Sequence, residues 1–539
     1  MDKNLKKGVF SARDIIPLPE KYEDRAGQFL LSRDGMILTD VPNKWNADYL
    51  RNLLSPPTGF PVDIQVSPQT INNSIRLSLN PRLKELGREG YLLEILPDTI
   101  VIESLDTAGI FYGIQTLRQL LPVEIEERHP VPGVDWRIQC LYITDKPRFS
   151  WRGFMLDESR YYHGTDAIYL SLDLMALQKL NVFHLHLTDD QGWRVEIKKY
   201  PKLTVVGSFR AGTSKNRLGK KHDGVPHGGY YSREEIRKIV GYAAERHITI
   251  VPEIEMPGHA MAALASYPEL ACRQNSYHVA THFGIFPDIF CAGKENVFSF
   301  LQDVLDEILD LFPSPYIHIG GDEAPKERWK GCPDCQRRIH ENELKDEHAL
   351  QVYFTNRVAK YIAIKGRRVI GWNEILHDGL VENAVLQYWA GGYHRLFEAL
   401  QNKEHPVVMS KYLDTYLDHS YSLMPLSRAY RYEPIPPGLD ENQAGNILGL
   451  EFPLWSEWVP NRARLDYQAY PRLTAMAETG WTSKNQKSFN DFLRRMEQFL
   501  VRLDYLGVRH APLKNAQPSN ILQWLGIFTI PMPQRAITK

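Results

Sequence analysis

The sequence has few cysteines, no excess of charge of one sign and no long hydrophobic run. Only 5 of the 539 residues are cysteine, too few for a disulfide scaffold. Lysine and arginine number 64 and aspartate and glutamate 65, so the formal net charge is −1. Nucleic acid and anionic membranes are therefore not expected partners. No stretch approaches the roughly 18 apolar residues of a membrane-spanning helix, which speaks against membrane insertion.

The cysteines give little sign of a special role. Their odd number fits a reducing compartment. Cys332-Pro-Asp-Cys335 is compatible with half a zinc site, a redox pair or a strained disulfide. Because no second Cys-x-x-Cys motif completes a zinc site, we expect plain thiols or a local staple, and no metal.

Targeting and cofactor motifs are also missing. The basic start MDKNLKKGVF precedes no apolar run typical of a secretory signal, which predicts a cytoplasmic protein unless a leader has been removed. No glycine-rich phosphate loop, Walker motif or Rossmann fingerprint opens a helix, so we expect no cofactor.

What is present indicates a globular protein of at least two domains. The chain far exceeds the roughly 250–300 residues at which a single core stops growing. Residues 27–105 alternate between apolar and polar side chains, which predicts a meander of half-buried strands. An amphipathic helix follows and ends at Pro122, and the polar, proline-containing stretch 124–135 is predicted to be a linker. We expect an N-terminal α+β domain over residues 1–146.

From about residue 150, short apolar runs alternate with longer amphipathic stretches. The helical stretches include 166–179, 232–246, 297–312 and 348–365. Eight runs are candidate strands: 152–157, 181–189, 248–256, 316–323, 367–374, 384–390, 406–414 and 446–457. Eight strand–helix units predict an α/β fold, a (β/α)8 TIM barrel, over residues 147–510. A C-terminal tail, residues 511–539, is expected to pack on the barrel.

Nearly every candidate strand ends in acidic or aromatic residues, where the active site of such a barrel lies. The strongest motif is His318-Ile319-Gly320-Gly321-Asp322-Glu323. Its two glycines permit a kink that turns both carboxylates toward one ligand. Like charges at short range disfavour joint ionisation, so such a pair can supply one proton donor and one anion.

These motifs together resemble glycoside hydrolase family 20, the β-N-acetylhexosaminidases. The matching segments are WRGFMLDESR (151–160), LNVFHLHLTDDQGW (180–193), PEIEMPGHA (252–260), HIGGDE (318–323), GWNE (371–374), YWAGG (388–392), Tyr416-Leu417-Asp418 and PLWSEW (453–458). The predicted N-terminal α+β domain is similar to the accessory domain of this family.

The resemblance implies retaining hydrolysis without a protein nucleophile. The 2-acetamido oxygen of the substrate would attack the anomeric carbon and form an oxazolinium intermediate. Glu323 would act as general acid and then as general base. Asp322 would hold the acetamido N–H, and Tyr416 would donate to the acetamido oxygen.

The resemblance also implies the contacts that hold the sugar. Arg160 would bind its 3- and 4-hydroxyls, with Glu457 and Asp418 as companions on the 4- and 6-hydroxyls. Three indoles would wall the acetamido pocket and support the sugar ring: Trp372, Trp389 and Trp455.

Asp189 and His259 resemble the pair that orients and tunes the acid Glu323. If they do so, activity should follow a bell-shaped pH profile with a weakly acidic to neutral optimum.

Parts of the sequence are compatible with other classes of function. His184 and His186 lie on one strand face, as in metal-dependent hydrolases, although they precede the strand end where barrel metals lie. A non-catalytic glycan-binding barrel would be expected to lose the acid or its partners. A conventional retaining glycosidase would need a carboxylate nucleophile, for which Glu374 or Glu457 could serve.

The predicted function is that of an exo-β-N-acetylhexosaminidase acting on terminal β-linked GlcNAc, and on GalNAc, of a small glycan or glycoconjugate. Discrimination between GlcNAc and GalNAc at the 4-hydroxyl depends on the geometry around Arg160 and Glu457.

Overall fold

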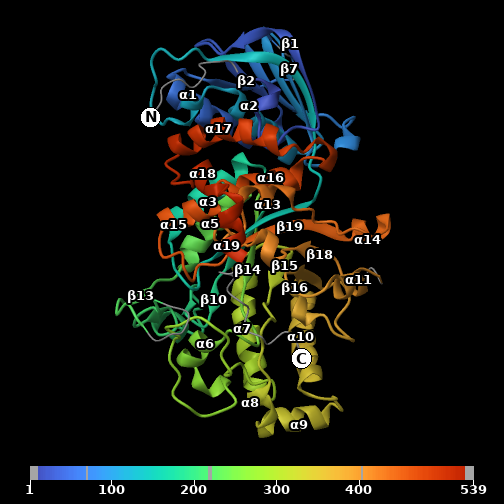
Figure 1. The fold of residues 1–539 in the computed structure, drawn as a ribbon. Coiled ribbons are helices and arrows are strands. Elements are labelled where there is room, and N and C mark those ends of the chain that lie inside the picture. The colour runs from blue at the N-terminus through green and yellow to red at the C-terminus, as the bar shows by residue number, and fades with distance from the viewer. Residues whose placement is uncertain (1–9, 68, 70, 216–220, 402–404, 528–539) are drawn as a thin grey trace.

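The computed structural model describes residues 10–527 except 68, 70, 216–220 and 402–404. Residues 1–9 and 528–539, which belong to the predicted first domain and tail, lie outside the described residues. A seven-stranded sheet with its helices lies at one end of the molecule, and a closed barrel with its surrounding helices forms the rest (Figure 1).

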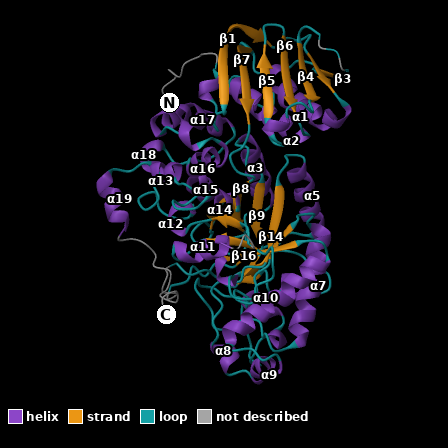
Figure 2. Cartoon of the chain, turned by 90° about the vertical axis from the view of Figure 1, so that its right-hand side faces the viewer, coloured by secondary structure: helices purple, strands orange, loops and turns teal. Residues whose placement is uncertain are grey.

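The N-terminal sheet has the strand order β1-β7-β5-β6-β4-β2-β3. Its strands are β1 (Lys21–Leu30), β2 (Met36–Thr39), β3 (Asp63–Val66), β4 (Ser74–Leu79), β5 (Tyr91–Ile95), β6 (Thr99–Ser104) and β7 (Arg137–Asp145). The helices α1 (Lys44–Thr58) and α2 (Thr107–Leu120) contact each other and cover one face of this sheet (Figure 2). The predicted alternation holds on that face, where Leu77, Leu93 and Ile102 are fully buried.

The prediction of a simple meander is wrong. Only β5 and β6 pair as an antiparallel hairpin, whereas β2 pairs in parallel with both β3 and β4, and β4 pairs in parallel with β6. The cause is α1, which was not predicted and connects β2 to β3 as a crossover. Parallel neighbours need such a connection, and a tight turn cannot provide it.

The predicted linker is also misplaced. After residues 124–135 the chain returns to the sheet as β7, which pairs with β1 and with β5. The chain therefore leaves the sheet only after Asp145, and the proline-containing stretch is a surface connection within the N-terminal domain.

The barrel closes in the order β8-β9-β14-β15-β16-β17-β18-β19, with every pair parallel. Seven of the eight strands fall within the predicted runs, and the eighth, β8, begins one residue before its run, which confirms the barrel. The eight strands are β8 (Trp151–Asp157), β9 (Val182–His186), β14 (Thr249–Glu253), β15 (Tyr316–His318), β16 (Arg368–Trp372), β17 (Val385–Tyr388), β18 (Val407–Met409) and β19 (Ile447–Leu454).

The predicted helices surround the barrel close to their expected bounds: α3 (Thr165–Leu177), α5 (Arg233–Ala244), α7 (Glu295–Leu311) and α10 (Glu347–Ile364). The other helices are α4 (Lys202–Val205), α6 (Met261–Ser266), α8 (Glu327–Lys330), α9 (Pro333–Glu341), α11 (Tyr393–Gln401), α12 (Tyr412–Thr415), α13 (Leu426–Arg431), α14 (Glu441–Gly445), α15 (Arg462–Ala469), α16 (Arg472–Trp481), α18 (Leu513–Ala516) and α19 (Asn520–Ile527). Short hairpins use β10 (Thr188–Asp189), β11 (Gly192–Trp193), β12 (Phe209–Arg210) and β13 (His227–Gly228).

The helix α17 (Phe489–Tyr505) lies between the sheet domain and the barrel (Figure 1). It buries its predicted apolar positions: Phe492, Met496, Phe499 and Leu503. Ser488 occupies the predicted N-cap position, but its side chain makes no capping hydrogen bond.

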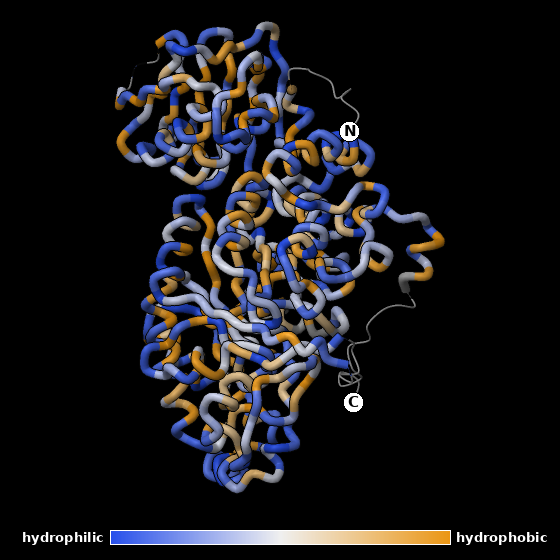
Figure 3. The backbone as a smooth tube through the Cα atoms, turned by 90° about the vertical axis from the view of Figure 1, so that its left-hand side faces the viewer, coloured by the Kyte–Doolittle hydropathy of each residue, from blue (hydrophilic) through white to orange (hydrophobic). Residues whose placement is uncertain are grey.

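Hydrophobic residues occur along the chain in short segments separated by hydrophilic ones (Figure 3). In keeping with this, no helix within the described part of the chain is long and apolar enough to span a membrane.

Candidate active site

The turn after β15 carries the two carboxylates of the strongest sequence motif. Gly320 and Gly321 have positive φ angles of 64° and 97°, and Glu323 has a φ of 43°. A Cβ on Gly320 would lie 1.7 Å from an oxygen of Glu255, so the turn requires glycine there. The kink brings Asp322 and Glu323 to one group, the imidazole of His259.

His259 connects both carboxylates to the loop after β9. Its Nε2 lies 3.8 Å from Asp322 Oδ2 and 3.7 Å from Glu323 Oε2. Its Nδ1 lies 3.0 Å from Asp190 Oδ2 and 3.4 Å from Asp189 Oδ1. Burial opposes protonation, but the charge of Asp189 and hydrogen bonds to both aspartates hold the pKa of His259 well above its ordinary value.

The sequence therefore identified only part of the His259 environment. The structure brings His259 and Asp189 together, yet the shorter contact is to Asp190, which was not predicted. The repeated acid in Thr188-Asp189-Asp190 was the available signal. Without geometry, it did not show which of the two faces the imidazole.

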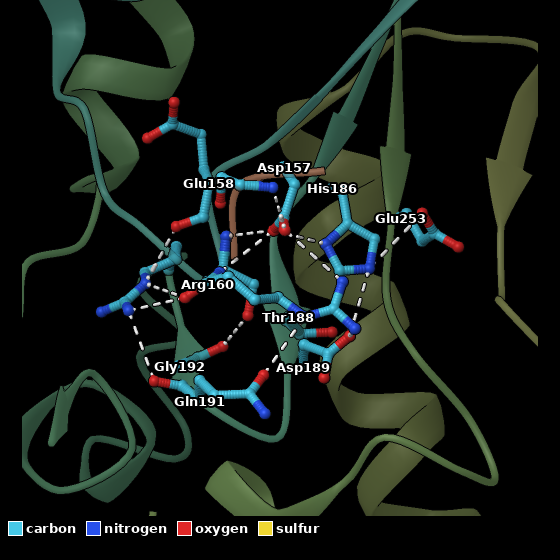
Figure 4. A network of polar contacts seen from close by, with 12 residues as sticks. Asp157, Glu158, Arg160, His186, Thr188, Asp189, Gln191, Gly192 and Glu253 are labelled. Atoms are coloured by element: carbon cyan, nitrogen blue, oxygen red, sulfur yellow. Dashed lines mark hydrogen bonds and ion pairs between the residues drawn. The ribbon is translucent and has the colours of Figure 1, made fainter. Parts of the chain in front are cut away.

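Arg160 lies at the centre of a polar network at the ends of β8 and β9 (Figure 4). Its Nη2 is 2.6 Å from Asp189 Oδ2, its Nη1 is 3.4 Å from Asp157 Oδ2, and its Nε donates to Gln191 Oε1 at 3.1 Å. Among the described residues, these contacts use one N–H of each terminal nitrogen, and the second N–H of each can bind a ligand. The guanidinium also lies 4.9 Å from the ring centroid of Trp455, which places both side chains in one site.

The aromatic residues predicted to wall the sugar site form one cluster. Trp372 and Trp455 have ring centroids 5.7 Å apart, and Tyr416 lies 6.2 Å from Trp455 and 6.4 Å from Trp389. The indole N–H of Trp372 donates to Glu253 and that of Trp389 to Glu374, at 2.9 and 2.8 Å. Because each indole N–H is hydrogen-bonded to a carboxylate, the orientation of both rings is fixed.

Several acids at the site have raised pKa values because of burial. Burial and the neighbouring charge of Glu255 hold the pKa of Asp322 well above its ordinary value. Burial raises the pKa of Asp418 and of Glu457 to about 7 each. The Oδ1 atoms of Asp322 and Asp418 are buried without a hydrogen-bond partner among the described residues. Buried acceptors of this kind are costly unless a ligand satisfies them.

The histidines considered as metal ligands lie deeper in the barrel and are paired with carboxylates. His184 Nδ1 is 2.7 Å from Glu451 and its Nε2 is 2.9 Å from Glu253. Burial alone would lower the pKa of His184, but these two carboxylates raise it to about 9. A histidine that binds a metal must be neutral. Because the two carboxylates favour the protonated imidazolium, His184 is suited to hydrogen bonding and not to binding a metal.

His186 is likewise surrounded by carboxylates. Its Nδ1 is 3.2 Å from Asp157 (Figure 4). Its Nε2 is 3.4 Å from Glu255. The carboxylates around it hold its pKa well above the ordinary value, although burial opposes this. The geometry of both histidines thus supports a structural role beneath the mouth of the barrel.

Known proteins match this chain along nearly its whole length. The profile of the glycosyl hydrolase family 20 catalytic domain matches residues 149–484, and that of domain 2 of the same family matches residues 12–146. A β-hexosaminidase of Porphyromonas gingivalis is 41% identical over 93% of this chain, which spans 64% of that relative. A β-hexosaminidase of Akkermansia muciniphila is 33% identical over 83% of this chain and 92% of its own length.

Solved structures agree with this assignment. A mutant β-hexosaminidase of Streptomyces plicatus in complex with the product GlcNAc is 32% identical, with a TM-score of 0.83 over 96% of this chain and 100% of its own. The β-N-acetylhexosaminidase of Bacteroides fragilis is 34% identical, with a TM-score of 0.80 over 94% of this chain and 99% of its own. The catalytic-domain match, the identity to the relatives and the closed barrel agree: the chain belongs to glycosyl hydrolase family 20.

Proposed function

We propose that this glycoside hydrolase is an exo-β-N-acetylhexosaminidase, which releases terminal, non-reducing β-linked GlcNAc, and also GalNAc, with retention of configuration. The proposal is carried by one observation: the carboxylates of Asp322 and Glu323 both approach the imidazole of His259. Beside them lies an aromatic cluster that includes Tyr416, and the buried Asp322 Oδ1 has no partner among the described residues.

In the proposed reaction, the carbonyl oxygen of the 2-acetamido group attacks the anomeric carbon while the glycosidic C–O bond breaks. Glu323 gives its proton to the departing oxygen, and an oxazolinium ion forms. Glu323, now ionised, then takes a proton from water. The resulting hydroxyl adds to the anomeric carbon, opens the ring and restores the acetamido group with retention.

The raised pKa of Asp322 suits its proposed role. A carboxylate that is buried among other acids is a high-energy anion, so a cation forming beside it is stabilised strongly. The nitrogen of the acetamido group becomes positive during ring closure, and its N–H would donate to the unpartnered Oδ1. Asp322 would therefore ionise most readily as the intermediate forms.

The remaining residues would fix the sugar. Tyr416 would donate to the acetamido oxygen and hold it near the anomeric carbon. The faces of the three tryptophans would exclude water around this group. Arg160 would use its two remaining N–H groups on sugar hydroxyls, with Glu457 and Asp418 as acceptors for the 4- and 6-hydroxyls.

The test compares nitrophenyl β-GlcNAc and β-GalNAc as substrates for the wild type, Glu323→Gln and Asp322→Asn. We expect kcat to fall by about 10²–10⁴-fold in each variant. We also expect a thiazoline mimic of the oxazolinium to inhibit the wild type, and brief EDTA treatment to leave its rate unchanged. The ratio of the two wild-type rates measures the preference for GlcNAc over GalNAc.

A second substrate series tests the identity of the nucleophile. Replacing the N-acetyl group by trifluoroacetyl weakens its oxygen as a nucleophile, so kcat/KM should fall steeply. A rate insensitive to this change would instead indicate a protein nucleophile such as Glu374 or Glu457. No turnover of either sugar would favour the glycan-binding barrel, and loss of activity on brief EDTA treatment would favour a metal-dependent hydrolase.

A further inference from the structure

Four of the five cysteines meet in one place. They lie on two segments that are separate in sequence, the loop after α6 and the start of α9. This four-cysteine cluster consists of Cys272, Cys291, Cys332 and Cys335. No second Cys-x-x-Cys motif exists, but two single cysteines bring their sulfurs to Cys332 and Cys335. These single cysteines lie 41 and 63 residues away, a spacing that no local motif reveals.

The sulfur positions fit a tetrahedral metal site. The four Sγ atoms all lie within 4.8 Å of one another. The Cys291 sulfur lies 3.6 Å from that of Cys332 and 3.5 Å from that of Cys335, and the Cys272 and Cys335 sulfurs are 3.8 Å apart. A zinc ion with four sulfur ligands at about 2.3 Å places neighbouring sulfurs about 3.8 Å apart. A disulfide would need about 2.05 Å, and all five cysteines are free thiols.

The surrounding backbone is shaped to bring these sulfurs together. Gly293 lies two residues after Cys291, and a Cβ there would lie 2.3 Å from the backbone nitrogen of Cys335 and 2.1 Å from the carbonyl carbon of Asp334. Any side chain at this position would push α9 away from Cys291.

The cluster is enclosed by protein. Cys291 and Cys335 are fully buried, Cys332 is 3% exposed, and Cys272 is partly buried. Sulfur ligands at this burial are those that zinc prefers over harder ions such as magnesium and calcium.

We propose that the four-cysteine cluster binds one zinc ion as a structural site. Binding converts four thiols into thiolates and releases four protons to solvent, with no change of oxidation state. Because sulfur fills all four positions, no water can bind to the metal, and the ion takes no part in hydrolysis.

The proposed ion would join the loop after α6 to the start of α9, and both segments are connected to parts of the active site. The segment between Cys272 and Cys291 supports the loop after β9: the N–H of Ala280 donates to the carbonyl of Asp190 at 2.9 Å, and Gln191 donates to the carbonyl of His282 at 2.8 Å. The start of α9 follows the turn that carries Glu323. The loop after α6 also contacts α8, the short helix before α9, where Trp329 donates to the carbonyl of Phe290 at 2.9 Å.

This arrangement places the site at the end of the molecule opposite the N-terminal sheet, where α8 and α9 lie (Figure 1). Cys140, the fifth cysteine, lies in β7 of that sheet and serves as an internal control.

The first experiment uses the wild-type protein, purified without chelator or added metal. Elemental analysis by mass spectrometry should find about one zinc ion per chain. Cobalt(II) exchanged into the protein should give the intense visible bands and the sulfur-to-metal charge-transfer absorption of a tetrahedral thiolate site. A metal-free protein whose thiols all titrate, or one whose mass is short of four hydrogens because of two disulfides, would overturn the proposal.

The second experiment locates the metal. The double variant Cys291→Ser/Cys335→Ser should lose the zinc and become more sensitive to proteolysis between residues 272 and 291, whereas Cys140→Ser should keep its zinc. If the double variant retains one zinc per chain, the ion lies elsewhere and the proposal is wrong. If this variant does not fold, the cobalt spectrum of the wild type decides. Metal content is measured directly, so the result is independent of the proposed glycosidase activity.

Discussion

At the scale of single residues, the charge of Asp322 is set by neighbours that never touch the substrate in the proposed mechanism. Glu255 lies two residues beyond β14, fully enclosed, with Oε1 3.4 Å from His186 Nε2. Burial, together with the charge of Glu253, raises the pKa of Glu255 to about 7. Glu255 in turn raises the pKa of Asp322, with smaller contributions from Glu374 and Glu323 and opposition from His259.

Replacing Glu255 by glutamine should shift the pH profile of the enzyme. The proposed mechanism needs ionised Asp322, so activity falls as the pH drops through the pKa of Asp322. Without the charge of Glu255 this pKa falls, and the acidic limb of kcat/KM should move to lower pH by about 1 unit. The measurement is kcat/KM for nitrophenyl β-GlcNAc across the acidic and neutral range.

The matched control is Glu255→Asp, which keeps the charge and should leave the acidic limb close to its wild-type position. If the glutamine variant lowers the rate equally at every pH, Glu255 is merely structural and the electrostatic argument fails.

Single residues also show how much of the candidate site could be predicted from the sequence. Asp322 and Glu323 stand in a motif at a strand end, so their place at the mouth of the barrel followed from the predicted barrel, whereas Arg160 was singled out by the family resemblance. Glu255 was visible as an acid at a strand end, but its effect on Asp322 was not. Asp190 could not be singled out, because its contact with His259 depends on which way the loop turns after the strand ends. The same holds for Cys272 and Cys291, since only the folded loops bring them to the Cys-x-x-Cys motif.

At the scale of elements, the turn after β15 determines where both acids lie. Gly320→Ala would put a methyl group 1.7 Å from Glu255 Oε2 at a residue whose φ is +64°. Either the enclosed Glu255 or the turn must move, and both changes displace Asp322 and Glu323. We expect kcat/KM to fall at least about tenfold, since strain of this kind costs about 1–3 kcal/mol. Steady-state kinetics on nitrophenyl β-GlcNAc measures the effect.

A control separates this clash from backbone strain. Gly507 has a similar φ of +71°, but nothing lies within 4 Å of a Cβ placed there. Gly507→Ala should lower the melting temperature and leave kcat/KM nearly unchanged. Equal kinetic losses in the two variants would show that the turn after β15 has no special role.

The elements themselves were predictable to different degrees. Barrel strands are continuous apolar runs, each followed by an amphipathic helix, and this rhythm identified all eight. In the N-terminal sheet, single strands were visible as alternation over 74–79 and 91–95, but their order was not. The helix α1, which carries Pro56 and Pro57 near its end, lies within the stretch 27–105 that was predicted to form strands only. Because this crossover was not predicted, the sheet was predicted as an antiparallel meander, whereas it contains both parallel and antiparallel pairs.

At the scale of the whole molecule, the two domains share a buried charge. Asp145, the last residue of β7, accepts hydrogen bonds from Tyr91 of the sheet at 2.6 Å and from Trp481 of α16 at 2.9 Å. Lys179, just after α3 on the barrel side, lies 2.9 Å from Asp145, and both side chains are fully buried. The domains are therefore joined by a polar network as well as by apolar packing, and we expect them to unfold together.

Lys179→Met tests this junction. The variant leaves the Asp145 carboxylate buried without its cation, which should lower the free energy of unfolding by about 3–5 kcal/mol. Lys238 pairs with Glu234 on an exposed surface of α5, so Lys238→Met should cost at most about 1 kcal/mol. Denaturant unfolding followed by circular dichroism measures both.

Lys179 precedes β9, at the end of the barrel away from the catalytic turn, where side chains serve stability rather than catalysis. The kcat and KM of folded Lys179→Met should therefore match those of the wild type. A loss no greater than that of Lys238→Met would show that the buried pair contributes nothing to the junction. Two separate unfolding transitions in the wild type would show that the sheet domain and the barrel are stable independently of each other.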